Sequence, residues 1–364
     1  MYVERQIPLR FGHASRAAQT HVNLSAVRQD GRCLWVAGDE TATVERLTAR
    51  TDEHGRLTGY DDERTFFLAD LIPLPAGREE EADIEGLCRD GAWLWAIGSH
   101  SLKRKRIKPH HNDAKSRRRL ASVVREDNRF VLARLPLVTG PDGLPEPVAR
   151  DGDRAAAVLG LHKDSLADLL ADDPHLAPFL AIPSKDNGLD IEGVATRGDR
   201  LYIGLRGPVL RGWAVLVEIR PGTDPDDPHR LRALRFADGA RYRTHFLDLR
   251  GLGIRDLCPH GDDLLVLAGP SMGLSGPVRL LRWRGACGTP APEADAPGIV
   301  HADDLETVGD LPHGDGEDHA EGVAVLDTGL TGGREKLLVV YDSPAAARLA
   351  ADEAVLADIV TLPQ

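Results

Sequence analysis

The sequence contains five copies of one short unit, and this internal repeat limits the fold more than any other feature. In four of the copies an apolar segment leads through a turn of Gly and Asp into a second apolar segment. The second copy, for example, covers residues 83–87, turns at Asp90 and Gly91, and continues over residues 93–98. A Gly/Asp turn between segments rich in β-branched and aromatic residues predicts a β-hairpin.

The five copies align without gaps up to the turn, so that equivalent positions can be compared directly. Successive copies are 60, 107, 63 and 66 residues apart, so three of the four intervals agree closely. The long interval either holds inserted segments or hides a sixth, degenerate unit. One aligned column consists of Ser25, Glu85, Glu192, Arg255 and Glu321.

Further strand-like segments follow each hairpin, and several units contain four of them before the next unit begins. Four antiparallel strands repeated radially are typical of a β-propeller. An α/β fold would instead need helices of about 10–15 residues between its strands, and the sequence has no such alternation. We therefore predict an all-β chain, a single β-propeller domain over residues 1–364 with five blades or six. Residues 7–9 or residues 358–362 are expected to complete a shared blade and close the ring.

Two insertions interrupt the repeat. Within residues 151–178, the segment 164–171 has a capped start and helical spacing, which predicts a short helix. Residues 102–119 are strongly basic and lack apolar periodicity, so we predict a polar loop there.

Composition excludes several classes of protein. The chain has 45 Lys and Arg against 57 Asp and Glu, a net charge of −12, which argues against general binding of nucleic acid or anionic membranes. It contains no apolar run of the length that a membrane span needs. The four cysteines form no C-x-x-C pair, which excludes a zinc ribbon and makes a disulfide framework unexpected. We expect a cytoplasmic protein.

The aligned glutamates are the main candidates for a functional site. Each opens the first strand of its unit, so Glu85, Glu192 and Glu321 are expected to meet at one mouth of a central channel. Carboxylates that converge in this way need neutralisation. A divalent cation such as Ca²⁺ would supply it, with Asp256, one position beyond the column, as a further ligand. Alternatively, Arg255 pairs with the carboxylates and no metal binds. The Gly after each Glu would in either case allow close backbone packing near the axis.

Residues that follow the second strands are expected at the same mouth. His100 is a candidate general acid or base, and Arg206 and Asp342 are candidate ligand contacts. Lys103 begins the basic loop, which could overhang the mouth and attract an anion. The alternatives are a loop histidine with ordinary hydrogen bonds and a solvated basic loop.

The sequence resembles an uncharacterised bacterial family of β-propellers, a domain of unknown function, over nearly its whole length. The motifs that carry this resemblance include Asp-Ile-Glu-Gly at 83–86 and 190–193, Gly-Ser-His-Ser at 98–101 and Tyr-Asp-Ser-Pro at 341–344. More distantly, the repeated Glu-Gly strand starts resemble those of esterase-like phytase and gluconolactonase-type propellers. That resemblance implies a central divalent cation and hydrolysis of phosphate or lactone esters.

Two functions remain open from the sequence. The first is a metal-dependent hydrolase, of the esterase or phosphoesterase kind, that acts on an anionic small molecule. The second is a non-catalytic propeller that binds a ligand or a partner protein. In the first, His100 would transfer protons; the ligand contacts would be Lys103, Arg206, Arg255 and Asp342; and the cation would be held by Glu85, Glu192, Asp256 and Glu321. The substrate, the partner and the oligomeric state are not indicated.

Overall fold

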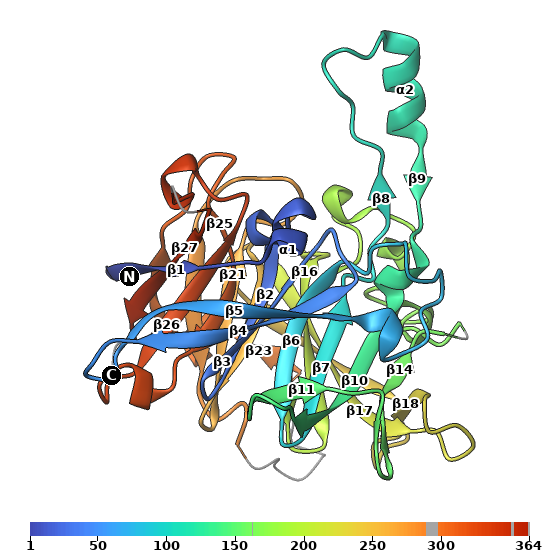
Figure 1. Cartoon of the computed structure of the whole chain (residues 1–364). Helices are drawn as coiled ribbons and strands as arrows, with labels where there is room; N and C mark the ends of the chain where they lie inside the picture. The colour runs from blue at the N-terminus through green and yellow to red at the C-terminus, as the bar shows by residue number, and fades with distance from the viewer. Residues whose placement is uncertain (162, 289–297, 351–352, 363–364) are drawn as a thin grey trace.

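The computed structural model describes residues 1–161, 163–288, 298–350 and 353–362, and these residues form mostly β-strands (Figure 1). The predicted all-β class is therefore confirmed. Helices are few and short, with α1 at His13–Ala17, α2 at Asp113–Ala121 and α3 at Leu166–Leu169. Within the described ranges, no helix has both the length and the apolar character needed to span a bilayer.

The structure has an antiparallel hairpin at each of the five sequence repeats, as predicted. The first strands are β2 (Leu24–Asp30), β6 (Ile84–Asp90), β15 (Asp190–Arg197), β20 (Gly253–His260) and β25 (His319–Val325). Their hairpin partners are β3 (Cys33–Gly38), β7 (Trp93–Gly98), β16 (Arg200–Gly207), β21 (Asp263–Gly269) and β26 (Lys336–Asp342).

The remaining strands extend each hairpin outward into a larger sheet. In the first unit these are β4 (Thr43–Thr51) and β5 (Leu57–Phe67). In the second they are β10 (Leu132–Thr139), β11 (Pro145–Pro147) and β14 (Ala157–Leu159), with β12 (Arg150–Asp151) and β13 (Arg154–Ala155) nearby in the chain. The later units add β17 (Trp213–Thr223), β18 (Leu231–Leu234), β19 (Tyr242–Asp248), β23 (Ile299–Val300), β22 (Val278–Trp283), β24 (Leu305–Leu311) and β27 (Val355–Thr361).

The five first strands surround a common axis, because they contact one another in the cyclic order β2, β6, β15, β20, β25 and back to β2. Glycines permit this close approach. A Cβ added to Gly86 would lie 3.0 Å from the backbone nitrogen of Val194, and one added to Gly193 would lie 2.9 Å from that of Leu257. The expectation that the Gly of the Glu-Gly motif serves backbone packing is thus confirmed.

The two chain ends close the ring. The N-terminal strand β1 (Val3–Leu9) pairs antiparallel with β27 and completes the sheet of the last unit. A single parallel pair, Leu9 with Tyr60, joins it to β5 of the first unit, which makes one eight-stranded sheet. Ile7 and Leu9 are buried in the core between the first and last units. A terminal strand closes the ring as expected, with both ends of the chain side by side.

The two insertions have different outcomes. The helix expected at 164–171 is present as the shorter α3, with a capping box of Ser165 and Asp168. The prediction of a loop at 102–119 is partly wrong. This segment belongs to a hairpin of β8 (Lys103–Arg104) and β9 (Val123–Val124), and α2 lies between the two strands in the chain. The hairpin stands out from the body of the molecule (Figure 1). We call residues 103–125 the arm.

Truncation of a buried side chain in β1 is predicted to destabilise the whole chain. Leu9 is fully buried, so Leu9→Ala should lower the free energy of unfolding by about 2–5 kcal/mol, measured by urea denaturation. Tyr2→Ala, at a side chain 80% exposed, is the control and should change it by less than about 0.5 kcal/mol. Equal stability of the two variants would mean that β1 does not hold the ring closed.

Candidate functional site

The starts of the first strands and the ends of the second strands lie at one end of the ring, which we call the mouth. Ile84 pairs with Gly98 there, and His319 pairs with Asp342. All five first strands have a register shift at the aligned column, so each column residue is the extra residue of a β-bulge. Bulges redirect a side chain. The sequence repeat aligned these five residues, but it did not reveal that each of them forms a β-bulge.

Seven carboxylates gather at the mouth and affect one another electrostatically. Burial is the main cause of a raised pKa at five of them, and the charges of neighbouring mouth carboxylates raise these pKa values further. Three arginines face them, Arg129, Arg206 and Arg255. The mouth therefore has four more carboxylates than arginines. The mouth carboxylates are Asp39, Asp83, Glu85, Asp190, Glu192, Glu321 and Asp342.

Arg255 and Arg206 both pair with the aligned glutamates. Arg255 forms an ion pair with Glu321, and its Nη1 lies 3.5 Å from Oε2 of Glu192. Arg206 Nη1 lies 2.6 Å from Oε1 of Glu192, and its Nε donates to Asp190 over 2.8 Å. The structure thus brings Glu192, Glu321 and Arg255 together as expected, and Arg206 joins them as a partner of the carboxylates.

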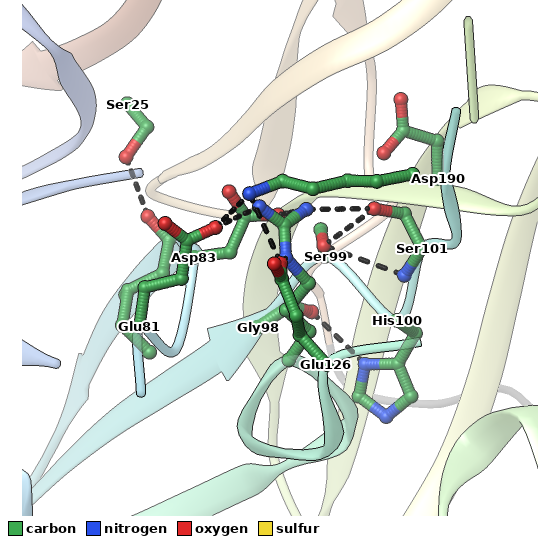
Figure 2. A network of polar contacts seen from close by, with 12 residues as sticks. Ser25, Glu81, Asp83, Gly98, Ser99, His100, Ser101, Glu126 and Asp190 are labelled. Atoms are coloured by element: carbon green, nitrogen blue, oxygen red, sulfur yellow. Dashed lines mark hydrogen bonds and ion pairs between the residues drawn. The ribbon is translucent and has the colours of Figure 1, made fainter. Parts of the chain in front are cut away.

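Arg129 neutralises the neighbouring part of the mouth, although no repeat position or motif in the sequence singled it out. It pairs with Asp83 and Glu81, and its Nη1 donates to Ser101 Oγ over 3.1 Å (Figure 2). Lys103, predicted to bind an anion, is instead 3.0 Å from Glu126 and also pairs with Glu81. Its charge is therefore already matched at the base of the arm.

Glu85 and Asp39 are the least compensated mouth carboxylates. The Glu85 side chain makes no hydrogen bond or ion pair with any residue that the structure describes, and Arg206 acts on it only through its charge at longer range. Burial raises its pKa well above the usual range, and Asp83, Glu192 and Glu321 raise it further. Burial and the charge of Asp83 raise the pKa of Asp39 to about 8. These two side chains therefore favour protons or a cation.

A group of metal-ligating side chains lies beside them. Ligand atoms of His319, Glu321 and Asp342 are all within 4.8 Å of one another. His319 Nδ1 is 3.7 Å from Oδ2 of Asp342, its partner in the strand register. His319 was not singled out from the sequence, although it occupies the repeat position that holds Asp83 and Asp190 in other units. A second aligned column, two residues before the first, would have revealed it.

The prediction that Asp256 is a metal ligand is wrong, because the structure does not bring it together with the other three predicted ligands. Its Oδ1 and Oδ2 accept hydrogen bonds of 2.6 and 2.9 Å from Arg28. They also accept from the backbone nitrogens of Leu257 and Val323 over 2.7 and 2.9 Å. Arg28 lies on β2 and also donates to the carbonyl of Val323 over 2.9 Å. This buried ion pair joins three first strands, and Asp256 has no free oxygen for a metal.

The structure also contradicts the prediction that His100 is a general acid or base at the mouth. Its φ of 53° is left-handed, and its ring points away from Asp83 and Asp190 (Figure 2). Nδ1 donates to the carbonyl of Gly98 over 2.9 Å, and the ring packs against Phe130 at 5.7 Å between centroids. Burial lowers its pKa to about 4, so the ring is neutral near pH 7. The described contacts give it no access to the mouth for proton transfer.

A family model described as "Protein of unknown function (DUF3616)" matches residues 23–358. No curated protein matches the sequence. Similar solved structures include the glutaminyl cyclase of Myxococcus xanthus, with TM-score 0.43, 10% identity and coverage of 100% of this chain and 97% of that one. The PQQ-bound aldose sugar dehydrogenase of Streptomyces coelicolor has TM-score 0.39, 12% identity and coverage of 98% and 97%. The periplasmic gluconolactonase of Pseudomonas aeruginosa has TM-score 0.32, 14% identity and coverage of 93% and 73%. With identities and TM-scores this low, the activity of none of these proteins can be assigned to this chain.

Replacement of His100 is predicted to remove part of the loss of stability in acid. The folded pKa of about 4 lies below the usual 6.5, so the unfolded chain binds the proton more readily. The stability from the neutral ring is complete above pH 6.5 and is lost as pH falls towards 4, a difference of about 3 kcal/mol. In urea unfolding at pH 7 and pH 4, His100→Asn should lose about that much less than the natural chain. Asn tolerates the left-handed backbone. Parallel losses would refute the assignment.

Removal of the Arg28 charge from Asp256 is predicted to lower the free energy of unfolding. Arg28→Met leaves a buried carboxylate without its cation and should lower the free energy of unfolding by about 3–5 kcal/mol. The double variant Arg28→Met/Asp256→Leu removes both charges and should recover most of that loss, measured by urea unfolding. A double variant as unstable as the single one would show that the loss is due to packing and not to the uncompensated charge.

Proposed function

The chain belongs to the family of proteins of unknown function whose model matches residues 23–358, and from its geometry we propose that it is a five-bladed β-propeller whose mouth binds a divalent cation. The blade number is supported by the cyclic contacts of the five first strands and by the β1–β27 closure. The cation is supported by one observation above the others, the convergence of His319, Glu321 and Asp342.

The donor set favours particular ions. Imidazole and carboxylate together suit Zn²⁺ or Mn²⁺, whereas Ca²⁺ prefers oxygen ligands alone. We therefore expect Zn²⁺ or Mn²⁺ ahead of the Ca²⁺ indicated by the sequence. Glu321 would be shared between the cation and Arg255, with which it forms an ion pair. Because the mouth has four more carboxylates than arginines, one divalent cation relieves the repulsion without reversing the charge.

The mouth also carries a candidate proton carrier. The Glu85 side chain has no hydrogen bond or ion pair among the described residues, and burial raises its pKa, which favours its protonated form. A carboxyl group of this kind is suited to general acid or base chemistry. A bound cation would polarise a substrate oxygen and lower the pKa of a bound water. Hydrolysis of an anionic ester is therefore the activity that we propose, with Glu85 in the role first given to His100.

A non-catalytic binding role is favoured by one separate observation. The arm projects from the body, and its helix carries exposed basic side chains. Such a protein would use the arm as a contact surface for a partner. The two roles are compatible, because the cation ligands and the exposed part of the arm are different residues.

Addition of metal is predicted to stabilise the protein through the mouth. A cation at about 100 times its dissociation constant adds about 2.7 kcal/mol to the free energy of unfolding. Differential scanning fluorimetry with Zn²⁺, Mn²⁺ or Ca²⁺, each with and without chelator, should show this as a rise in Tm. His319→Ala and Asp342→Asn should abolish the rise. His175→Ala is the matched control, because His175 Nδ1 is likewise 3.7 Å from a carboxylate, that of Asp173.

The metal affinity should also depend on pH. Burial raises the pKa of Glu321, one of the proposed ligands, and raises that of its neighbour Asp39 to about 8, so protons at acidic pH oppose binding of the cation. Isothermal titration should show affinity that increases from pH 6 to pH 8. Absence of bound metal in the purified protein, together with no Tm change for any of the ions, would contradict the proposal.

A further inference from the structure

The arm concentrates positive charge on an otherwise acidic chain. Residues 103–125 contain ten Lys and Arg and one Asp, a net charge of +9, while the rest of the chain carries −21. Three of these basic residues, Lys103, Arg104 and Arg125, pair with carboxylates at the base of the arm. Charge separated to this degree produces strong fields of opposite sign on two parts of one molecule. The arm therefore attracts acidic surfaces, and the body attracts basic ones.

The helix of the arm buries none of its residues, and its contacts are with the strand β8 of the same arm. All the residues of α2 remain at least partly exposed, and a nine-residue helix without packing is marginal in water. Its support is local. Asn112 caps the first turn by accepting from the backbone nitrogen of Lys115 over 2.9 Å, and Arg118 and Arg119 stand favourably in the last turn. A surface that covers α2 would supply the missing stabilisation.

The side chains of the arm fit a protein surface better than a nucleic acid. Ile107, Leu120 and Val123 are exposed by 39%, 48% and 43%, and together they provide aliphatic contact area among the charges. The arm contains no Phe, Tyr or Trp on which bases could stack. The −21 charge on the rest of the chain would in addition repel a polyanion.

The arm begins beside the mouth. Lys103 pairs with Glu126, which also pairs with Arg129 of the mouth, and Arg104 Nε is 2.6 Å from Oδ2 of Asp186. From this base the arm extends away from the body, so α2 does not cover the mouth of its own chain (Figure 1). Any acidic surface that α2 contacts would therefore belong to another molecule.

We propose that the arm docks on the acidic mouth face of a second copy of this chain. Two mouths facing each other across a two-fold axis would place each arm beside the other mouth, which gives a closed, self-complementary dimer. The arm of one copy would then form one wall of the other's mouth.

The test is the oligomeric state of the full chain, measured by sedimentation velocity in the presence of chelator. A dimer is expected at low salt and a monomer in about 1 M salt, where the Debye length falls to about 3 Å. Because no metal is present, failure of the proposed cation site would leave this result unchanged. Conversely, a monomeric protein that binds metal would overturn only the dimer.

Charge reversal on α2 tests whether this helix forms the dimer contact. Lys115→Glu/Arg117→Glu/Arg118→Glu changes three exposed side chains and should weaken the dimer at least about tenfold. Arg32→Glu/Arg56→Glu/Arg235→Glu is the matched control, with the same change in net charge at exposed positions outside the arm, and should weaken the dimer less than about threefold. Circular dichroism of both variants checks that they fold.

Three results would overturn the proposal. The first is a monomer at every salt and protein concentration. The second is a dimer that weakens equally in the two triple variants. The third is a monomer that binds a duplex DNA probe in fluorescence anisotropy at physiological salt and loses this binding when α2 is reversed, which would make the arm a nucleic-acid contact.

Discussion

The antiparallel pairing of β1 with β27 is the constraint on which the rest of the structure depends. Each unit has only a narrow sheet, and its first strand is stabilised by contact with the first strands of its neighbours. Pairing of the two chain ends completes the last sheet and makes that set of contacts cyclic. Closure brings the first and last units together, so that Ser25 and Glu321 share one mouth although they are far apart in the sequence.

Closure also creates an electrostatic problem, and the mouth solves it only in part. The β-bulges direct the column residues to the mouth, where burial and mutual repulsion raise the pKa values of the glutamates. Arginines from three different units neutralise some of these charges. Deeper in the ring, Arg28 and Asp256 form a buried ion pair that ties β2, β20 and β25 together. The remaining carboxylates of the mouth, Glu85 and Asp39 above all, are the groups beside which we propose that a cation binds.

The sequence predicted those features that depend on local chemistry. Hairpins follow from Gly/Asp turns and apolar segments, and the meeting of Glu192, Glu321 and Arg255 follows from the repeat. Other features depend on distant partners. The pairing of Asp256 with Arg28, 228 positions away, leaves no local mark in the sequence, and the direction of His100 depends on one left-handed residue. The helix of the arm was missed because it buries nothing and so has no apolar stripe. Cytoplasmic location and hydrolysis stay predictions.

The central claim is that the mouth of this ring is a cation site held by the last unit. Crystals grown with Mn²⁺ and measured at a wavelength where manganese scatters anomalously test it most directly. The account predicts an anomalous peak bonded to His319, Glu321 and Asp342, with Arg255 still in contact with Glu192. A map without a peak at the mouth, in which Arg255 and Arg206 alone contact these carboxylates, would contradict it.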